Sequence, residues 1–246
     1  MFGKKATRIE WALTTNIGRR AVNEDSVLAV EEDGRYLFVV ADGLGGHGMG
    51  QDAANLVTQV FENEFYLNKN SPDFLGGAFA RAQELVMLAQ EENNLVNQMK
   101  TTAAALYIDG VMLSYGHVGD TRVYHFKNNK LLARTYDHTV TQMLVYSGEL
   151  KEEDINTHPD RSRLLYVIGD KWEKPKYEIV LLRRGARAGQ GFLICTDGIW
   201  EITPNPEPPG SKDADAWLED VVSKTREECE TNEKVDNFSA IAVLMR

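Results

Sequence analysis

Two apolar runs in this chain end in the same dipeptide, an aspartate followed by a glycine. Asp42-Gly43 comes directly after the run VVA, and Asp197-Gly198 comes directly after ICT. Asp236-Asn237 stands immediately before the last apolar run, FSAIAVL. A carboxylate beside a buried strand is costly unless it is paired, because the low-dielectric interior solvates charge poorly. A fold that brings these strand ends together must therefore neutralise several negative charges in one place.

These acidic residues are of the kind that binds hard metal ions. Glu24-Asp25 and Asp120 lie at the borders of further short apolar runs. Each dipeptide taken alone is explained more simply as a turn, since Asp-Gly and Asp-Asn favour turns. The set as a whole indicates a divalent cation, and oxygen ligands without His or Cys select Mg²⁺ or Mn²⁺.

Composition argues against several other classes of protein. With 27 basic and 37 acidic residues the net charge is −10, which disfavours nucleic acid as a partner. The chain has two cysteines, Cys195 and Cys229, so we expect neither a disulfide framework nor a Cys-based zinc cluster. We expect both to be reduced thiols of a cytoplasmic protein. No charge-free run approaches the ~18 apolar residues of a membrane-spanning helix, so we expect no membrane partner.

Hydrophobic periodicity predicts an α+β protein. Helical spacing of apolar residues predicts helices over 53–65, 75–89, 139–147 and 213–230. Short apolar and β-branched runs predict strands at 9–15, 36–41, 103–108, 111–117, 121–126, 130–135, 177–182, 192–196 and 238–244. Dipeptides typical of hairpins separate the central strands, namely Asp109-Gly110, Gly119-Asp120 and Asn128-Asn129. Antiparallel sheets covered by helices are therefore favoured. No linker divides the chain, so we expect one domain over 1–246.

Seven short motifs follow one another along almost the whole chain. They are Arg20-Ala-Val-Asn-Glu-Asp25-Ser26, Val40-Ala-Asp42-Gly43-Leu-Gly-Gly-His47-Gly, Thr101-Thr102, Gly116-His-Val-Gly-Asp120-Thr-Arg122, Asp137-His138-Thr139, Cys195-Thr-Asp197-Gly198-Ile-Trp200-Glu and Asp236-Asn237-Phe-Ser. In this order they resemble the motifs of metal-dependent Ser/Thr protein phosphatases of the type-2C (PPM) family, in its compact bacterial form.

The resemblance implies a fold and a mobile accessory segment. The fold is a sandwich of two antiparallel β-sheets flanked by helices, in four layers (αββα). Residues 140–169 would form a flap beside the active site. His158 and Arg161 match landmarks of that flap, and we expect both to contact protein substrates.

The resemblance also implies a centre of two tightly bound Mn²⁺ or Mg²⁺ ions. Asp42 would bridge both ions, the Gly43 carbonyl would bind one, and Asp197 and Asp236 would bind the other. A water or hydroxide that bridges the ions would attack the phosphorus of phosphoserine or phosphothreonine, which is chemistry that two-metal sites support.

Further residues of the site follow from the same resemblance. Glu24 and Asp25 would hold coordinated water, and Arg20 would bind the substrate phosphate through its forked guanidinium. Asp120 would help Asp197 to hold a third, weaker ion. We expect loss of Asp120 to spare the two tight ions and to slow turnover.

One position departs from the pattern of many eukaryotic members. Leu44 follows Asp42-Gly43 where those members have a histidine that is thought to protonate the leaving group. The identity of the general acid is therefore open, and a metal-bound water is one substitute for the histidine. For His47 both a structural role and a contact with phosphate or water stay open. For His138 we expect a role in stabilising a turn.

The alternative hypothesis is a pseudophosphatase that binds phosphoproteins without turnover. Loss of Asp42, Asp197 or Asp236 would indicate it, and the presence of all three favours an enzyme. We expect the substrates of the enzyme to be phosphoproteins that a Ser/Thr kinase modifies, and we expect the protein to be a monomer.

Overall fold

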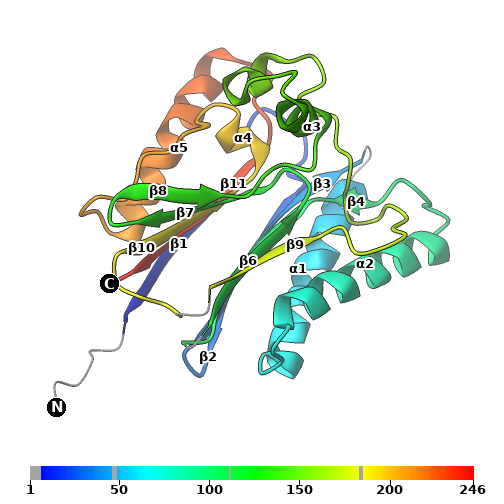
Figure 1. The fold of residues 1–246 in the computed structure, drawn as a ribbon. Coiled ribbons are helices and arrows are strands. Elements are labelled where there is room, and N and C mark those ends of the chain that lie inside the picture. The colour runs from blue at the N-terminus through cyan, green and yellow to red at the C-terminus, as the bar shows by residue number, and fades with distance from the viewer. Residues whose placement is uncertain (1–6, 46–48, 111, 183–184) are drawn as a thin grey trace.

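The computed structural model describes residues 7–45, 49–110, 112–182 and 185–246. Two antiparallel sheets pack face to face (Figure 1). The five-stranded sheet contains, in spatial order, β1 (Ile9–Asn16), β11 (Phe238–Met245), β10 (Gln190–Cys195), β7 (Arg122–Lys127) and β8 (Lys130–Arg134). The six-stranded sheet contains β2 (Asp25–Glu32), β3 (Arg35–Leu44), β5 (Ala103–Ile108), β6 (Leu113–Val118) and β9 (Glu178–Leu182), and β4 (Lys100–Thr101) pairs with β3.

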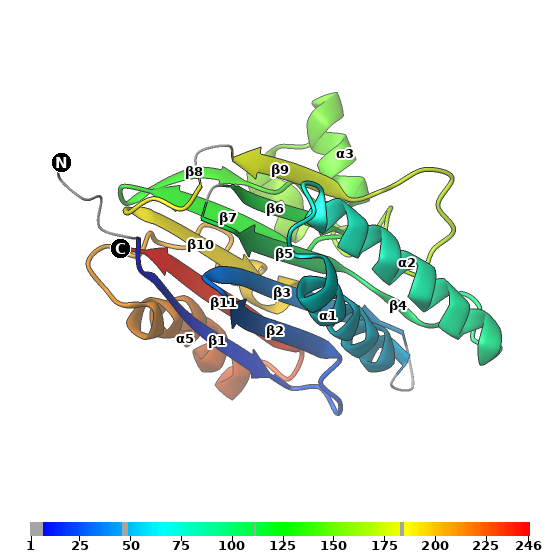
Figure 2. The same ribbon diagram turned by 90° about the horizontal axis from the view of Figure 1, so that it is seen from below.

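Helices cover both outer faces of this sandwich. The helices α1 (Met49–Asn68) and α2 (Phe74–Glu92) lie along the six-stranded sheet, as the view from below shows (Figure 2). The long helix α5 (Ala214–Thr231) and the single turn α4 (Asp197–Trp200) lie on the five-stranded sheet. The helix α3 (Val140–Ser147) and the 3₁₀ helix η2 (Glu152–Thr157) belong to the segment 140–169. The expected four layers are confirmed.

Alternation along the buried strands builds three hydrophobic clusters. In β3, Leu37, Val39 and Ala41 pack toward α1 and α2, while Phe38 and Val40 pack toward the other sheet. A third cluster lies between the five-stranded sheet and α5. A strand that is buried on both faces reads as a continuous apolar run, which is why β3 is easy to find in the sequence.

Two of the three expected hairpins are confirmed, and the third is wrong. Asp109-Gly110 joins the paired strands β5 and β6, and Asn128-Asn129 joins β7 and β8 with positive φ at both residues. Gly119-Asp120 instead carries the chain from β6 in one sheet to β7 in the other. A turn dipeptide indicates a change of direction but not the strand that follows as a partner. This crossing places Asp120 between the two sheets.

Within the described residues, no helix has both the length and the apolar character needed to cross a membrane.

Candidate metal centre and active site

The acidic motifs meet at one end of the sandwich because of strand register. In the five-stranded sheet, Asn16 at the end of β1 pairs with Phe238 at the start of β11. Cys195 at the end of β10 pairs with Ala240 on one side and with Arg122, at the start of β7, on the other. The chain segments that adjoin these strand ends carry Arg20, Asp120, Asp197 and Asp236.

The six-stranded sheet contributes two carboxylates that stand opposite each other. Asp25 begins β2, and its partner across the ladder is Asp42 in β3. Like charges in directly opposed positions repel, so this pair is unfavourable without a counter-ion. The backbone of Asp42 is held firmly, since its carbonyl accepts hydrogen bonds from the Thr101 hydroxyl (2.7 Å) and the Thr102 N–H (2.9 Å).

Glycine allows the acidic motifs to pack directly on neighbouring backbone. A Cβ atom at Gly198 would lie 2.1 Å from the Asn237 carbonyl oxygen, so the Asp-Gly and Asp-Asn motifs of the five-stranded sheet are in contact. At Gly43 a Cβ atom would lie 2.2 Å from the carbonyl oxygen of Gly50 at the start of α1. A side chain at Gly198 or Gly43 would force these segments apart and move the adjacent aspartates.

The carboxylates from both sheets lie near enough to raise one another's pKa, although among the described residues no three of them have oxygens within 4.8 Å of one another. Burial raises the pKa of Asp42 well above its usual value, and the charges of Asp197, Asp25, Asp120 and Asp236 raise it further. Burial also raises the pKa of Asp197, again with contributions from Asp120, Asp236 and Asp25. For Asp25 burial raises the pKa to about 7, although hydrogen bonds from Ser239 and Thr196 oppose the shift.

The donor set fits hard divalent cations. Thr196 donates to Asp25 Oδ2 (3.1 Å), whereas Asp25 Oδ1 is buried and has no hydrogen-bond partner among the described atoms. Desolvation also raises the pKa of Glu24, with Asp236 as the largest charge contribution. Several carboxylates that are costly to ionise, and one orphaned oxygen, are what a cation with oxygen ligands would stabilise. Asp42, Gly43, Asp197, Asp236, Asp25, Glu24 and Asp120 are all positioned at this end.

Arg20 lies beside the predicted metal ligand Asp236. Its Nη2 is 2.5 Å from Asp236 Oδ2, while Asp236 Oδ1 accepts the Asn237 N–H at 2.8 Å. Arg20 keeps about half of its side chain exposed. Because a guanidinium has five N–H donors, this contact leaves others for a phosphate.

Arg161 reaches the same site from the segment 140–169. A cavity of about 290 Å³ is lined by Arg20, Arg161, Asp197 and Asp236, together with Ser162, Gly198, Glu201, Ile202, Asn232, Lys234 and Val235. Arg161 Nε donates to Glu201 Oε1 (3.1 Å), and Glu201 directly follows α4. His158 is not among the lining residues, and its Nδ1 accepts the Asp160 N–H (3.1 Å) within a local turn.

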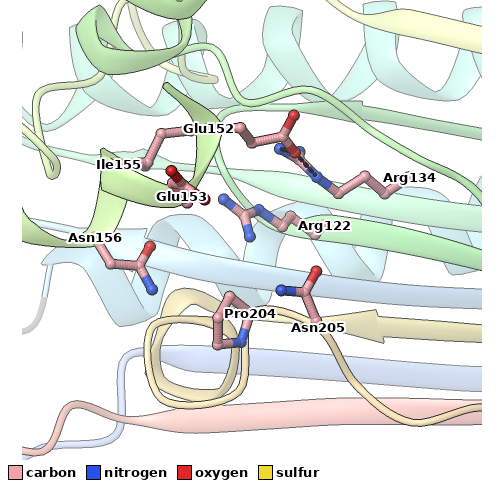
Figure 3. Close-up of a pocket in the computed structure, with 8 residues that line it drawn as sticks. All are labelled: Arg122, Arg134, Glu152, Glu153, Ile155, Asn156, Pro204 and Asn205. Carbon is pink, nitrogen blue, oxygen red and sulfur yellow. Dashed lines mark hydrogen bonds and ion pairs between the residues drawn. The ribbon is translucent and has the colours of Figure 1, made fainter. Parts of the chain in front are cut away.

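The segment 140–169 is anchored at its C-terminal end, where Ile168 and Thr101 exchange two backbone hydrogen bonds and Gln90 donates to the Gly169 carbonyl (2.8 Å). Asn156 donates to the Glu201 carbonyl (2.9 Å), and Arg134 Nε donates to Glu152 (3.0 Å). Between these contacts lies a second cavity of about 390 Å³, floored by Arg122 and bordered by Pro204 and Asn205 (Figure 3). Around this cavity polar side chains of the segment meet the rest of the molecule, whereas Ile168 at its C-terminal end is fully buried in the hydrophobic core.

A histidine cluster lies close to the acidic site, and His138 within it is committed to a hydrogen bond. Among the described residues, His117, His138 and Glu178 form the one group of three whose ligand-type atoms all lie within 4.8 Å of one another. His138 Nδ1 accepts the Gly119 N–H (3.2 Å), which places the proton of the neutral ring on Nε2, 3.6 Å from Glu178. A protonated nitrogen has no lone pair for a metal. His138 thus holds the turn before Asp120.

Sequence reasoning assigned no role to some residues that build the site. Asn237 donates to the carbonyls of Ile17 (2.8 Å) and Val22 (2.9 Å) and accepts the Glu24 N–H (2.9 Å), so it holds the loop that carries Arg20. Its place in the Asp236-Asn237 motif was the one available signal. Leu44 is half-buried in β3 opposite Lys100, and His47 lies outside the described residues.

Comparison with known proteins gives this arrangement a family. Residues 14–238 match the family model of protein phosphatase 2C. The chain belongs to the protein phosphatase 2C family. The resemblance expected from the motifs is confirmed over most of the chain.

Bacterial serine/threonine phosphatases are among the relatives of this chain. The chain is 35% identical over 185 residues to the serine/threonine protein phosphatase PstP of Mycobacterium tuberculosis, a match that covers 73% of this chain and 34% of PstP. This chain therefore spans about a third of PstP. It is 28% identical over 240 residues to the serine/threonine phosphatase stp of Listeria welshimeri, covering 91% of this chain and 86% of stp.

Solved structures share the fold. The crystal structure of M. tuberculosis PstP superposes with a TM-score of 0.81 at 26% identity and covers 97% of this chain and 99% of that chain. The catalytic domain of PstP in complex with two manganese ions superposes with a TM-score of 0.73 at 24% identity, covering 96% of this chain and 98% of the other.

Proposed function

We propose that this protein is a metal-dependent phosphatase that hydrolyses phosphoserine and phosphothreonine esters of proteins. One observation carries the proposal, namely the convergence of Asp42 from one sheet with Asp197 and Asp236 from the other, beside Arg20. The family and the serine/threonine phosphatases among its relatives support the same reaction. A pseudophosphatase is disfavoured because all three carboxylates are present.

We propose Asp42, the Gly43 carbonyl, Asp197 and Asp236 as ligands of two Mn²⁺ or Mg²⁺ ions, and Glu24 and Asp25 as holders of coordinated water. The catalytic domain of PstP, which has the same fold, is in complex with two manganese ions, and this supports a centre of two ions. When bound, two such ions lower the pKa of a water molecule and stabilise the entering and leaving oxygens of the phosphoryl group. We propose Asp120, with Asp197, for a third and weaker ion.

The chain's own residues orient the substrate. Arg20 offers a planar fork of donors to two phosphate oxygens, and it lies where Asp236 holds it toward the cavity. Arg161 lines the same cavity from the segment 140–169, which would place it against the peptide that carries the phosphorylated residue. His158 lies outside the lining of that cavity, so its proposed substrate contact rests on the family resemblance alone.

The decisive test is hydrolysis of a phosphothreonine peptide with Mn²⁺, with EDTA, and with Mn²⁺ restored. We expect activity in the first and third conditions only. Asp42→Asn and Asp236→Asn should each remove turnover, whereas Asp33→Asn, at the far end of the β2–β3 hairpin, should not. Full activity after exhaustive chelation, or in Asp42→Asn, would overturn the proposed function.

The setting of the enzyme is also proposed. By analogy with bacterial relatives, we propose a partner Ser/Thr kinase. This enzyme would remove the phosphate groups that the kinase adds to its substrates. Both cysteines are free thiols, with Cys195 fully buried, which supports a reducing compartment such as the cytoplasm. A monomer is the simplest state, and light scattering of the purified protein tests it.

A further inference from the structure

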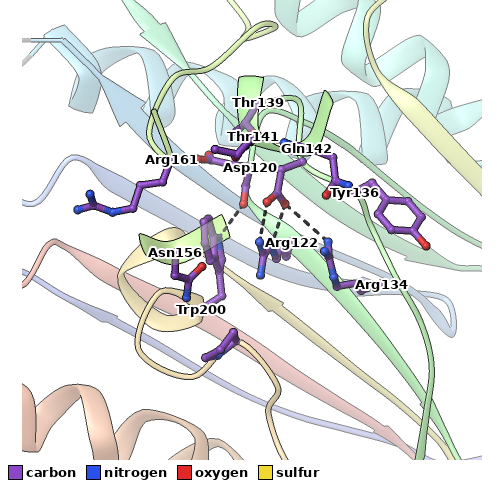
Figure 4. Close-up of polar contacts among 12 residues, drawn as sticks. Asp120, Arg122, Arg134, Tyr136, Thr139, Thr141, Gln142, Asn156, Arg161 and Trp200 are labelled. Atoms are coloured by element: carbon purple, nitrogen blue, oxygen red, sulfur yellow. Dashed lines mark hydrogen bonds and ion pairs between the residues drawn. The ribbon is translucent and has the colours of Figure 1, made fainter. Parts of the chain in front are cut away.

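Trp200 joins the two aspartates that are proposed to share the third ion. It is the last residue of the single helical turn that begins at Asp197. Its indole Nε1–H donates to the backbone carbonyl of Asp120 (2.8 Å), which lies 80 residues earlier in the chain (Figure 4). One rigid side chain therefore connects the backbone of one carboxylate to the short helix that carries the other.

Trp200 is itself held in place by Arg122. The guanidinium carbon of Arg122 lies 3.6 Å from the centre of the Trp200 ring, a cation–π contact. Arg122 also forms two hydrogen bonds to Asp137, at 2.8 Å and 2.6 Å, and this ion pair is buried. Trp200 is only 1% exposed. The indole cannot turn away from Asp120 without breaking these contacts.

Other contacts hold the backbone around Asp120 but do not reach Asp197. His138 accepts the Gly119 N–H, and the Thr121 and Thr102 hydroxyls lie 2.5 Å apart. These contacts anchor the turn to the six-stranded sheet and to the segment before α3. Trp200 alone among them comes from the helix that begins at Asp197, so it adds a side-chain link between the two acidic turns to the backbone pairing of Cys195 with Arg122.

We propose that Trp200 is a positioning residue that fixes the distance between Asp120 and Asp197, and thereby the affinity of the third cation. This inference rests on the proposed function, because it assumes that Asp120 binds a weak third ion. Outer residues that hold metal ligands typically change metal affinity or activity by 10–100-fold when they are removed. Trp200 would act through position only, since it touches neither substrate nor metal.

The chain offers a matched control in Trp217. This second tryptophan is also 1% exposed, and its indole donates to a backbone carbonyl, that of Glu207, at 2.9 Å. It lies in α5, away from the acidic site. Trp200→Phe and Trp217→Phe therefore remove the same atoms and one equivalent hydrogen bond from equally buried places.

The experiment measures Mn²⁺ binding by titration calorimetry and turnover of a phosphothreonine peptide at rising Mn²⁺. For Trp200→Phe we expect the two tight sites to be kept, the weak site to weaken by about tenfold or more, and turnover to fall by a similar factor. Excess Mn²⁺ should restore turnover. Trp217→Phe should bind Mn²⁺ and turn over as the wild type does. If Trp200→Phe behaves as Trp217→Phe does, or loses tight sites as well, the inference is wrong.

Asp120→Asn separates this inference from the function on which it rests. If Asp120→Asn binds the weak ion normally, the proposal that Asp120 holds this ion is wrong, and the proposed role of Trp200 is wrong with it. If Asp120→Asn weakens the third ion, Trp200→Phe in that background should add no further loss, because both changes act on one ligand. Additive losses would overturn the inference. Should Trp200→Phe fail to fold, replacement of Trp200 by 3-benzothienylalanine keeps the ring shape and removes only the N–H.

Discussion

At the scale of single residues, Asn237 shows how one side chain can organise an active site. Its amide group binds three backbone groups of the loop between β1 and β2, the loop that presents Arg20 and Glu24. Asn237 is itself buried, so each of these bonds is costly to lose. The loop has no strand ladder of its own, so these three bonds hold it together with the bond from the Arg19 N–H to the Val235 carbonyl (3.0 Å) and that from the Gly43 N–H to the Glu24 carbonyl (3.1 Å).

We predict that Asn237→Asp will weaken substrate binding and stability together. The aspartate keeps an acceptor for the Glu24 N–H but turns two donors into a negative oxygen that faces carbonyls. The free energy of unfolding should fall by about 2–4 kcal/mol, and KM for a phosphopeptide should rise as Arg20 loses its position. Asn232→Asp adds the same charge to the cavity that Arg20 lines, without holding the loop, so an equal rise in KM there would contradict the prediction.

A second prediction concerns pH and a histidine far from the metal site. His125 is buried between the sheets and stacks on Phe192 at 4.3 Å. Burial first, and then the charge of Lys127, lower the pKa of His125 to about 4. The folded state therefore resists protonation of His125. The stability that the neutral ring contributes is fully present above its unfolded pKa of about 6.5, and it is lost as the pH falls from there toward 4.

His125→Phe should remove that dependence. Between pH 7.5 and pH 5 the wild type should lose about 2 kcal/mol more unfolding free energy than the variant does. Urea denaturation at both pH values measures the difference, and the acidic site contributes equally to both proteins. Parallel losses in the two proteins would mean that His125 is not the group that titrates.

Sequence reasoning reached some of these residues and could not reach others. Asp42, Asp197 and Asp236 could be predicted because each interrupts or borders an apolar run, where an unpaired charge is costly. Asn237 has its partners 220 and 215 residues away, so nothing near it in the chain reveals them. The contact from Trp200 to Asp120 is equally invisible, because an indole in an apolar run reads as core.

At the scale of elements, the length of the apolar run bears on which strands could be predicted. Strand β3 is buried over most of its length and was expected, whereas β2 has only four apolar residues, 27–30, between polar ones and was not. Strand β4 and helix α4 are two and four residues long, too short for any periodicity. Yet β2 begins at Asp25 and α4 at Asp197, so two elements missed in the sequence carry acidic residues of the site.

The segment 140–169 carries the third prediction. Arg161→Ala should reduce turnover of a phosphopeptide more than turnover of a small aryl phosphate, because the small ester makes few contacts beyond the phosphate. Arg163→Ala is the matched control, since Arg163 lies in the same segment, is 70% exposed and does not line the cavity. Equal losses on both substrates after Arg161→Ala would instead place Arg161 in the catalytic machinery.

At the scale of the whole molecule, the acidic site lies across the interface between the two sheets. Asp25 and Asp42 belong to the six-stranded sheet, while Asp197 and Asp236 flank strands of the five-stranded sheet. Their mutual repulsion opposes packing of the two sheets at this end. A bound cation would make the electrostatic contribution to this packing favourable. Stability should therefore respond strongly to metal.

The fourth prediction compares thermal unfolding of the wild type and Asp42→Asn. In EDTA near pH 7.5 the variant should be the more stable protein by about 1 kcal/mol or more, or ~2–4 °C in Tm, because the costly ionised Asp42 is gone. With Mn²⁺ the order should reverse, since only the wild type gains the full binding energy. A wild type that is the more stable in EDTA would show that repulsion at Asp42 is negligible.

The division of the acidic site between two sheets has a consequence for how such sequences can diverge. Side chains between the sheets, such as Tyr115 and Phe192 with rings 5.9 Å apart, set the spacing of the carboxylates at the far end. A substitution that changes the side-chain volume between the sheets still shifts one half of the site against the other, even where the protein stays folded. Inherited substitutions in this layer should therefore accumulate in compensating pairs, a larger residue on one sheet matched by a smaller one on the other.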